Sequence, residues 1–138
     1  MLLKDKVILV TGAAQGLGLA IARRFGSEGA IVFLGDLKEE QGRTAAAELA
    51  SRGFRAWFAR LDVADEESWK AALAEVIDRA EKLDVLVNNA GINIREPIEE
   101  MSVENLDRML VVNVRGPFLG IKHALPLLRR NGGGCIIN

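Results

Sequence analysis

The first feature that could do chemistry is the glycine-rich stretch Thr11–Gly18, which reads TGAAQGLG. It follows a short apolar run and opens an amphipathic stretch, the context that gives a glycine fingerprint its weight. Gly12 allows a tight turn, Gly16 lets the backbone approach a pyrophosphate, and Gly18 lets the helix pack closely on the strand. The N–H groups at the start of a helix also attract anionic oxygens. The stretch therefore predicts a dinucleotide phosphate site, and the alternative is a flexible turn with no ligand.

An aspartate, Asp36, stands at the end of the second apolar run. It follows Gly18 at close to the spacing of about 20 residues that separates such a turn from the carboxylate that binds a ribose diol. A carboxylate there repels a 2′-phosphate, and the positive charge that such a phosphate needs is supplied by none of Ala13, Ala14, Gln15 and Leu37. We therefore predict NAD as the cofactor, in preference to NADP. The alternative is a solvated aspartate at a strand end.

Two more polar motifs follow apolar runs, Asp62–Val63 after the third and Asn88–Gly91, which reads NNAG, after the fourth. The carboxylate and backbone N–H of the first could hold an adenine edge. Amides such as that of Asn89 bridge backbone groups of neighbouring loops, and the small Gly91 admits close approach of a ligand. Each motif alone is equally compatible with a polar turn at a strand end.

Together these motifs resemble the short-chain dehydrogenase/reductase family. The matching residues are Thr11–Gly18, Asp36, Asp62–Val63, Asn88–Gly91 and Asn113. The resemblance implies a cofactor site made by Gly12, Gln15, Gly16, Leu17, Gly18, Asp36, Asp62, Val63, Asn89, Ala90 and Gly91. It also implies that Asn113 is one of the family's four catalytic residues, where it helps to hold a water in the proton relay.

The other three catalytic residues of the family are a serine just past the fifth strand and, further on, a Tyr-x-x-x-Lys pair. The 138 residues contain no tyrosine, and loss of a general acid/base typically costs about 10²- to 10⁴-fold in rate. We therefore expect an NAD-binding domain truncated after the fifth strand, which keeps only Asn113 and is inactive by the family mechanism. One alternative is a fragment of a full-length NAD-dependent short-chain oxidoreductase. Another is an oligomerising scaffold with a vestigial nucleotide site.

The elements that must position these motifs alternate between short apolar runs and longer amphipathic stretches. The predicted strands are Lys6–Val10, Ile31–Leu34, Arg55–Arg60, Val85–Val87 and Cys135–Ile137, and the predicted helices are Gly18–Glu28, Glu39–Ser51, Asp65–Lys82 and Ser102–Arg130. This alternation predicts a single α/β domain over residues 1–138, a Rossmann-like, doubly wound parallel sheet with helices on both faces. Right-handed crossovers give the strand order 3-2-1-4-5.

The last predicted helix, residues 102–130, is expected to break locally at Gly116–Pro117, because proline removes a helical hydrogen bond. Its apolar residues lie on more than one face, which predicts burial on more than one side. One stripe consists of Leu110, Val114, Phe118, Ile121, Leu125 and Leu128. In the family that this chain resembles, the corresponding helix packs against a partner subunit, so we expect a homo-oligomer through this helix; the alternative is a wide core face of a monomer. Lys122 and His123 follow Asn113 by about 13 Å along the helix axis and are expected outside the site.

Composition excludes several other classes of partner. Eighteen basic and nineteen acidic residues leave a net charge of -1 with no block of like charges, which argues against nucleic acid. The single Cys135 permits no internal disulfide, and a chain of this size needs no metal to fold. The uncharged stretch Val7–Ala22 holds several glycines and a glutamine, which argues against a membrane span. We expect a cytoplasmic protein with a dinucleotide cofactor and no metal.

Overall fold

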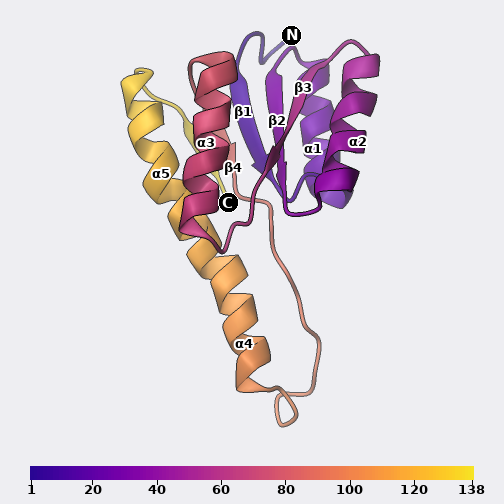
Figure 1. Cartoon of the computed structure of the whole chain (residues 1–138), viewed down its shortest axis with the longest axis vertical. Coiled ribbons are helices and arrows are strands. Elements are labelled where there is room, and N and C mark those ends of the chain that lie inside the picture. Colours follow the sequence, from indigo (N-terminus) through magenta and orange to yellow (C-terminus); the bar gives the residue numbers. More distant parts are fainter.

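The sheet has five parallel strands in the order β3-β2-β1-β4-β5, which confirms the predicted topology. In the computed structural model, which describes residues 1–138, strands and helices alternate along the chain (Figure 1). The strands are β1 (Val7–Thr11), β2 (Ile31–Asp36), β3 (Arg55–Arg60), β4 (Val85–Val87) and β5 (Cys135–Ile137). The helices are α1 (Gly16–Ser27), α2 (Glu39–Ser51), α3 (Glu66–Ala80), α4 (Val103–Leu110) and α5 (Gly116–Arg130), with a π-helical turn, η1 (Val111–Arg115), between the last two.

The central strands are buried on both faces because helices cover both sides of the sheet. Every residue of β1, which reads VILVT, is buried, as expected for a β-branched run inside a parallel sheet. Leu9 packs with α3 and α5, in the same cluster as Trp69. Its neighbour Ile8 points to the opposite face and packs with α1 and α2, in the same cluster as Leu49. The residue period of two along the strand thus divides the core into two layers.

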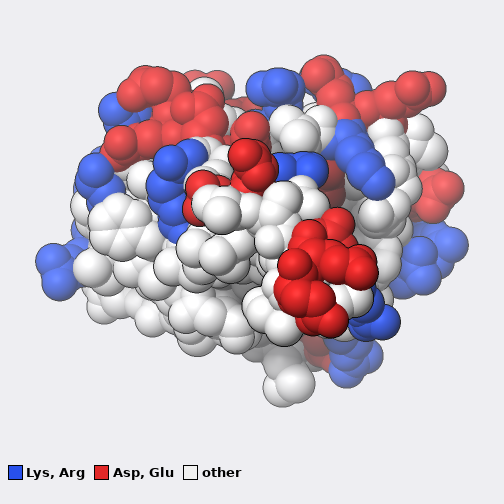
Figure 2. Space-filling model, turned by 90° about the horizontal axis from the view of Figure 1, so that it is seen from below, with Lys and Arg blue, Asp and Glu red and all other residues white.

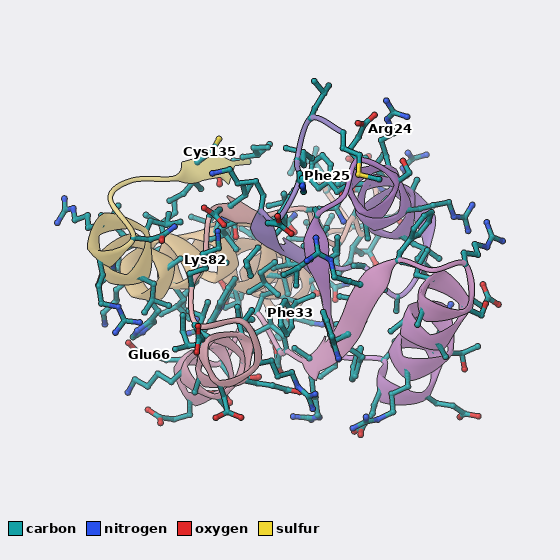
Figure 3. All side chains as sticks on the ribbon, turned by 90° about the horizontal axis from the view of Figure 1, so that it is seen from above. Arg24, Phe25, Phe33, Glu66, Lys82 and Cys135 are labelled. Carbon is teal, nitrogen blue, oxygen red and sulfur yellow. The ribbon has the colours of Figure 1, made fainter.

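Aromatic side chains illustrate the two layers. Phe33 of β2 belongs to the layer beneath α3 and α5, whereas Phe25 of α1 packs against the layer on the other face (Figure 3). Phe33 also stacks on Trp57 of β3, with ring centroids 5.6 Å apart. Cys135 is exposed and lies at the outer edge of the sheet, on β5 (Figure 3).

A buried carboxylate, Asp84, joins the start of β1 to β4 and to the end of α5. It is only 5% exposed and accepts hydrogen bonds from the N–H of Val7 at 2.8 Å and from Asn131 Nδ2 at 3.0 Å. Lys82 and Lys6 form ion pairs with it at 2.9 and 3.3 Å. Burial on its own would raise the pKa of Asp84, but the Val7 N–H and the two ammonium groups outweigh it and hold the pKa below its ordinary value.

The predicted third helix begins and ends close to its expected bounds. Asp65 is its N-cap, and the Asp65 carboxylate accepts a hydrogen bond from the N–H of Glu67 at 3.2 Å. The helix ends at Ala80, two residues before Lys82, because Glu81 adopts a left-handed backbone with φ +62°.

The predicted break at Gly116–Pro117 differs in place and form from what the structure shows. The helix continues through these residues, and the irregularity is the wider turn η1, in which the N–H of Gly116 donates to the carbonyl of Val111. In a regular helix residue 117 would donate to the carbonyl of Asn113, and proline has no N–H to do so. The wider turn therefore stands beside a carbonyl that has lost its helical donor.

The apolar stripe of the last helix is buried at one end only. Leu128 is 3% exposed and packs against the sheet, whereas Leu110, Val114 and Phe118 are 48%, 61% and 60% exposed. The alternative of a wide monomer core face is therefore wrong for these three residues. α4 and the loop before it extend away from the sheet (Figure 1). Within these residues, no other segment covers Leu110, Val114 or Phe118.

Candidate functional site

A cavity of about 540 Å³ lies beyond the carboxyl ends of the central strands. Every residue predicted to contact a cofactor lines it. Five lining residues were not predicted: Leu37, Lys38, Leu61, Ile92 and Val112. The volume falls within the range of about 300 to 1,000 Å³ that is usual for small-molecule sites.

The turn between β1 and α1 presents unpaired backbone donors to this cavity. Gly12 and Gly16 have φ of +65° and +58°, a conformation that glycine adopts without strain. The N–H groups of Gly16, Leu17 and Gly18 donate to no acceptor in the chain, and the first bond of the helix runs from Leu19 to Gln15 at 3.2 Å. A Cβ added at Gly16 would meet nothing within 4 Å. Open space over three unpaired N–H groups at a helix start fits a phosphate.

Gly18 serves packing rather than space for a ligand. A Cβ there would collide with the carbonyl oxygen of Gly12 and lie 2.6 Å from Asn89 Nδ2. The absence of a side chain lets the first turn of α1 sit directly on the turn after β1 and on the loop after β4.

The loop after β4 is fastened to β1 by Asn89 and Thr11. Asn89 Nδ2 donates to the Thr11 carbonyl at 2.9 Å and more weakly to that of Gly12 at 3.3 Å. The buried Thr11 hydroxyl accepts from the N–H groups of Asn89 at 3.0 Å and Ala90 at 2.9 Å. The predicted bridging role of the amides is confirmed for Asn89, whereas Asn88 donates to Asn138 Oδ1 at 2.8 Å.

Asp36 is held by two backbone donors. Its Oδ2 accepts from the N–H of Ala14 and its Oδ1 from the N–H of Lys38, each at 2.9 Å. Each oxygen keeps a further acceptor position, which a ribose diol could use. Lys38, which the sequence analysis did not consider, also lines this cavity.

Asp62 and Val63 offer the pair of groups predicted for an adenine edge. Asp62 Oδ1 accepts from the N–H of Ala64 at 2.9 Å, which fixes the carboxylate but leaves its second oxygen open. The carbonyl of Val63 accepts from Trp69 Nε1 at 3.0 Å, whereas the N–H of Val63 donates to no acceptor in the chain. Both residues line the cavity, so a carboxylate and an unpaired backbone donor come from adjacent lining residues.

Asn113 fastens the last helix to the loop after β4. Its Oδ1 accepts from the N–H of Ile92 and its Nδ2 donates to the carbonyl of Ile92, both at 2.8 Å. A Cβ at Gly91 would lie 3.2 Å from Asn113 Oδ1, so Gly91 makes room for this side chain. One Nδ2 proton and one Oδ1 lone pair of Asn113 remain free to bond a further group. The backbone carbonyl of Asn113 is also free of the usual helical bond, because Pro117 has no N–H to donate.

Lys122 and His123 lie outside the cavity, as predicted, and contact Glu66. Glu66 lies at the start of α3 (Figure 3). Lys122 Nζ and His123 Nε2 approach the same oxygen of Glu66, at 2.6 and 2.7 Å. Hydrogen bonds from Lys122 and then His123 lower the pKa of Glu66 to about 2. These residues form a link between α3 and α5.

No group of three or more His, Cys, Asp or Glu side chains is placed to hold a metal ion. None of the helices combines the length and apolar character needed to cross a bilayer.

A model of the family described as short chain dehydrogenase matches residues 6–138. The chain belongs to the short-chain dehydrogenase family. The family binds nicotinamide dinucleotides, and the unpaired N–H groups of the turn together with the free oxygens of Asp36 suit such a group.

Several curated short-chain dehydrogenases are similar to this chain. It is 42% identical over 134 residues to cyclopentanol dehydrogenase of a Comamonas strain. The matched region covers 97% of this chain and 54% of that protein. It is 46% identical over 136 residues to 2,5-dichloro-2,5-cyclohexadiene-1,4-diol dehydrogenase LinX of Sphingobium indicum, covering 99% and 54%. It is 41% identical over 139 residues to trans-4-hydroxycyclohexanecarboxylate dehydrogenase of Sinomonas cyclohexanicum, covering 96% and 53%. The chain spans about half the length of these relatives.

Proposed function

We propose that this chain forms the NAD-binding half of a full-length short-chain oxidoreductase. The observation that carries the proposal is the meeting of three unpaired N–H groups and the doubly held Asp36 carboxylate in one cavity. The half-length match to whole dehydrogenases supports this fragment hypothesis over that of a free-standing, inactive domain. The family's tyrosine and lysine would then belong to the remainder of the parent protein.

Each part of the cofactor has a partner among these residues. The N–H groups of Gly16, Leu17 and Gly18 bind the pyrophosphate. Asp36 accepts from the ribose diol, and the carboxylate of Asp62 with the N–H of Val63 holds the adenine edge. The bound nicotinamide supplies the hydride acceptor or donor.

We assign Asn113 a positioning role in the proposed reaction. Its side chain holds the Ile92 loop against the last helix, and its backbone carbonyl lacks a donor from residue 117. That carbonyl, with the remaining amide positions, is suited to hold a water that carries protons from the substrate side.

The substrate class proposed for the parent protein is a secondary alcohol on a carbon ring. The names of the three relatives each specify an alcohol on a five- or six-membered ring. Because the match covers half of each relative, this class rests on the relatives and not on a pocket in these residues.

The test is hydride transfer by the purified protein in its full-length form. NAD with cyclopentanol or cyclohexanol should give reduced nicotinamide, measured by absorbance, and the straight-chain 1-pentanol should give far less. An exposed-surface variant, Ile98→Ser, serves as the control because Ile98 is 86% exposed and does not line the cavity. NAD binding with no reduction of NAD by either ring alcohol would contradict the proposed substrate class.

We also propose that the exposed apolar residues of the last helix pair with a second copy of the chain. Leu110, Val111, Val114, Arg115 and Phe118 line a hollow of about 480 Å³. Seen from the end where α4 lies, charged residues gather along one side of the molecule and a broad uncharged area occupies the other (Figure 2). Exposed apolar residues that lie together, as Leu110, Val114 and Phe118 do, usually mark a contact, and they favour a homo-oligomer.

A further inference from the structure

Arg115, at the end of η1, reaches from the last helix to the loop that follows β3. Its Nη2 donates to the carbonyl of Ala64 at 2.9 Å, although the two residues are 51 apart in sequence. Gly116, the next residue, packs directly on Val63, because a Cβ there would lie 3.1 Å from Val63 Cγ2. Arg115 does not line the proposed cofactor cavity, whereas Asp62 and Val63 do. Any effect of Arg115 on the cofactor therefore passes through this loop.

The carbonyl of Ala64 has no donor within its own part of the chain. The two carbonyls before it accept from α3 and its N-cap, from Trp69 Nε1 at 3.0 Å and from the N–H of Asp65 at 3.1 Å. No backbone N–H donates to the Ala64 carbonyl. Arg115 therefore supplies the donor that completes the set, and it is the one donor of the three that comes from the last helix.

The peptide group that Arg115 holds is linked to both groups proposed for the adenine edge. Its N–H, that of Asp65, donates to the Asp62 carbonyl at 3.1 Å. The C=O and N–H of a trans peptide point in opposite directions, so this bond turns the N–H of Val63 away from Asp65. The N–H of Ala64 donates to Asp62 Oδ1 at 2.9 Å and fixes the carboxylate. The contact with Arg115 is thus one peptide group away from the proposed adenine donor.

The turn η1 holds two loops of the cavity at once. Asn113 binds the backbone of Ile92 in the loop after β4, and Arg115 binds the loop after β3. Two residues make roughly half a helical turn, so these side chains leave the helix on opposite sides. Val112 of the same turn lines the cavity itself.

We propose that Arg115 is a positioning residue for the adenine end of the cofactor. It fixes the peptide between Ala64 and Asp65, and through that peptide it keeps the Asp62 carboxylate and the Val63 N–H in the orientation that binds adenine. A loop that is already held in this orientation loses less conformational freedom when the ligand binds. The inference rests on the proposed NAD site and deepens it, because it makes adenine recognition depend on the last helix.

Calorimetric titration of the purified protein with NAD and with nicotinamide hypoxanthine dinucleotide tests the proposal. Adenine presents an amino donor and a ring-nitrogen acceptor at this edge, whereas hypoxanthine presents a carbonyl acceptor and a ring N–H donor. The wild type should bind NAD about tenfold more tightly, because Asp62 and Val63 face like groups in the analogue. Arg115→Met should narrow this preference to about threefold or less, because a loosened loop discriminates less between the two edges. Arg115→Lys keeps a donor and should retain more of the preference than Arg115→Met.

Arg108→Met is the matched control, because it removes an equal charge from an exposed residue of α4. It should leave the preference within about twofold, since distant exposed charges are screened by salt. Arg115 also lines the apolar hollow on the last helix, so variants are compared at equal mass by light scattering.

The outcomes separate the role of Arg115 from the NAD site. A folded Arg115→Met variant that keeps the wild-type preference refutes the role of Arg115 and leaves the NAD site standing. An equal loss of affinity for both dinucleotides also refutes that role, because the effect is then one of general stability. Equal narrowing by Arg108→Met refutes it as an effect of net charge. A wild type that binds both dinucleotides equally refutes the adenine-edge assignment together with the role of Arg115. A folded wild type that binds neither dinucleotide refutes the NAD site itself.

Discussion

Asn89 and Thr11 hold the two loops of the proposed cofactor site together. The Asn89 amide donates to the Thr11 carbonyl at 2.9 Å, and the Thr11 hydroxyl accepts from the N–H groups of Asn89 and Ala90. The glycine-rich turn and the NNAG loop are therefore joined into one unit, although Thr11 and Asn89 are 78 residues apart in sequence.

Thr11→Val should remove the hydroxyl that accepts these two hydrogen bonds and should keep the shape of the side chain. Two partly buried N–H groups, those of Asn89 and Ala90, then lack a partner, and we expect a loss of about 2 kcal/mol in the free energy of unfolding. Affinity for NAD should fall as well, because the turn is no longer held. Denaturant unfolding and calorimetry measure the two effects. Thr11→Ser keeps the hydroxyl and should preserve most of the stability and most of the NAD affinity. Equal losses in the Ser and Val variants would show that the hydroxyl does not matter.

Gly16→Ala and Gly18→Ala should have different effects, because Gly16 leaves room for a ligand whereas Gly18 allows close packing of the chain. A methyl group at Gly18 meets the Gly12 carbonyl, so we expect about 3 kcal/mol of destabilisation from overpacking. At Gly16 the space is open and the cost is about 1 kcal/mol for the left-handed backbone. The Gly16 variant should nevertheless lose NAD affinity, because the methyl group points into the phosphate position. A Gly16 variant that is folded and binds NAD normally would place the phosphate elsewhere.

Asp84→Asn should destabilise the protein in a pH-dependent way. At pH 7 the carboxylate accepts from Val7 and pairs with Lys82, and replacing it should cost about 2 to 4 kcal/mol. The pKa of Asp84 in the folded protein lies below its unfolded value of about 3.9. The carboxylate therefore contributes its full stabilisation above the unfolded pKa, and this stabilisation is lost as the pH falls through the folded pKa. Unfolding curves of the wild type and the variant should therefore converge below about pH 4. Asp5→Asn, which changes an exposed aspartate, should show no such convergence.

Phe118→Glu should dissociate the proposed oligomer without unfolding the chain. Phe118 is 60% exposed in the single chain, so a charge there costs little in the monomer but is buried in the pair. Light scattering should show a fall to the monomer mass at an unchanged circular dichroism spectrum. Ile98→Glu adds the same charge at an exposed residue outside the helix and should leave the mass unchanged. A wild-type protein that is monomeric at all concentrations would contradict the proposal.

The sheet and the glycine turn could be predicted from sequence because their signals are local. β-Branched runs such as Val7–Val10 fix the strands, and a strand, turn and helix in succession fix the turn. The strand order followed from right-handed crossovers together with the usual order of a doubly wound sheet.

The features that sequence reasoning missed depend on distant or spatial contacts. Asn113 and Ile92 are 21 residues apart, and no local pattern pairs them. Lys38 lines the same cavity as Asp36 because the chain bends before α2, and no local sequence pattern indicates that bend. The break expected at Pro117 became the wider turn η1, because a helix can absorb a missing donor by widening the preceding turn.

Calorimetric titration of the purified wild-type protein with NAD tests the central claim most directly. We predict saturable binding of one NAD per chain and markedly weaker binding by the Gly16→Ala variant. Absence of saturable binding by a protein whose circular dichroism shows it to be folded would contradict the claim, and would leave the glycine turn and Asp36 as inherited scaffold.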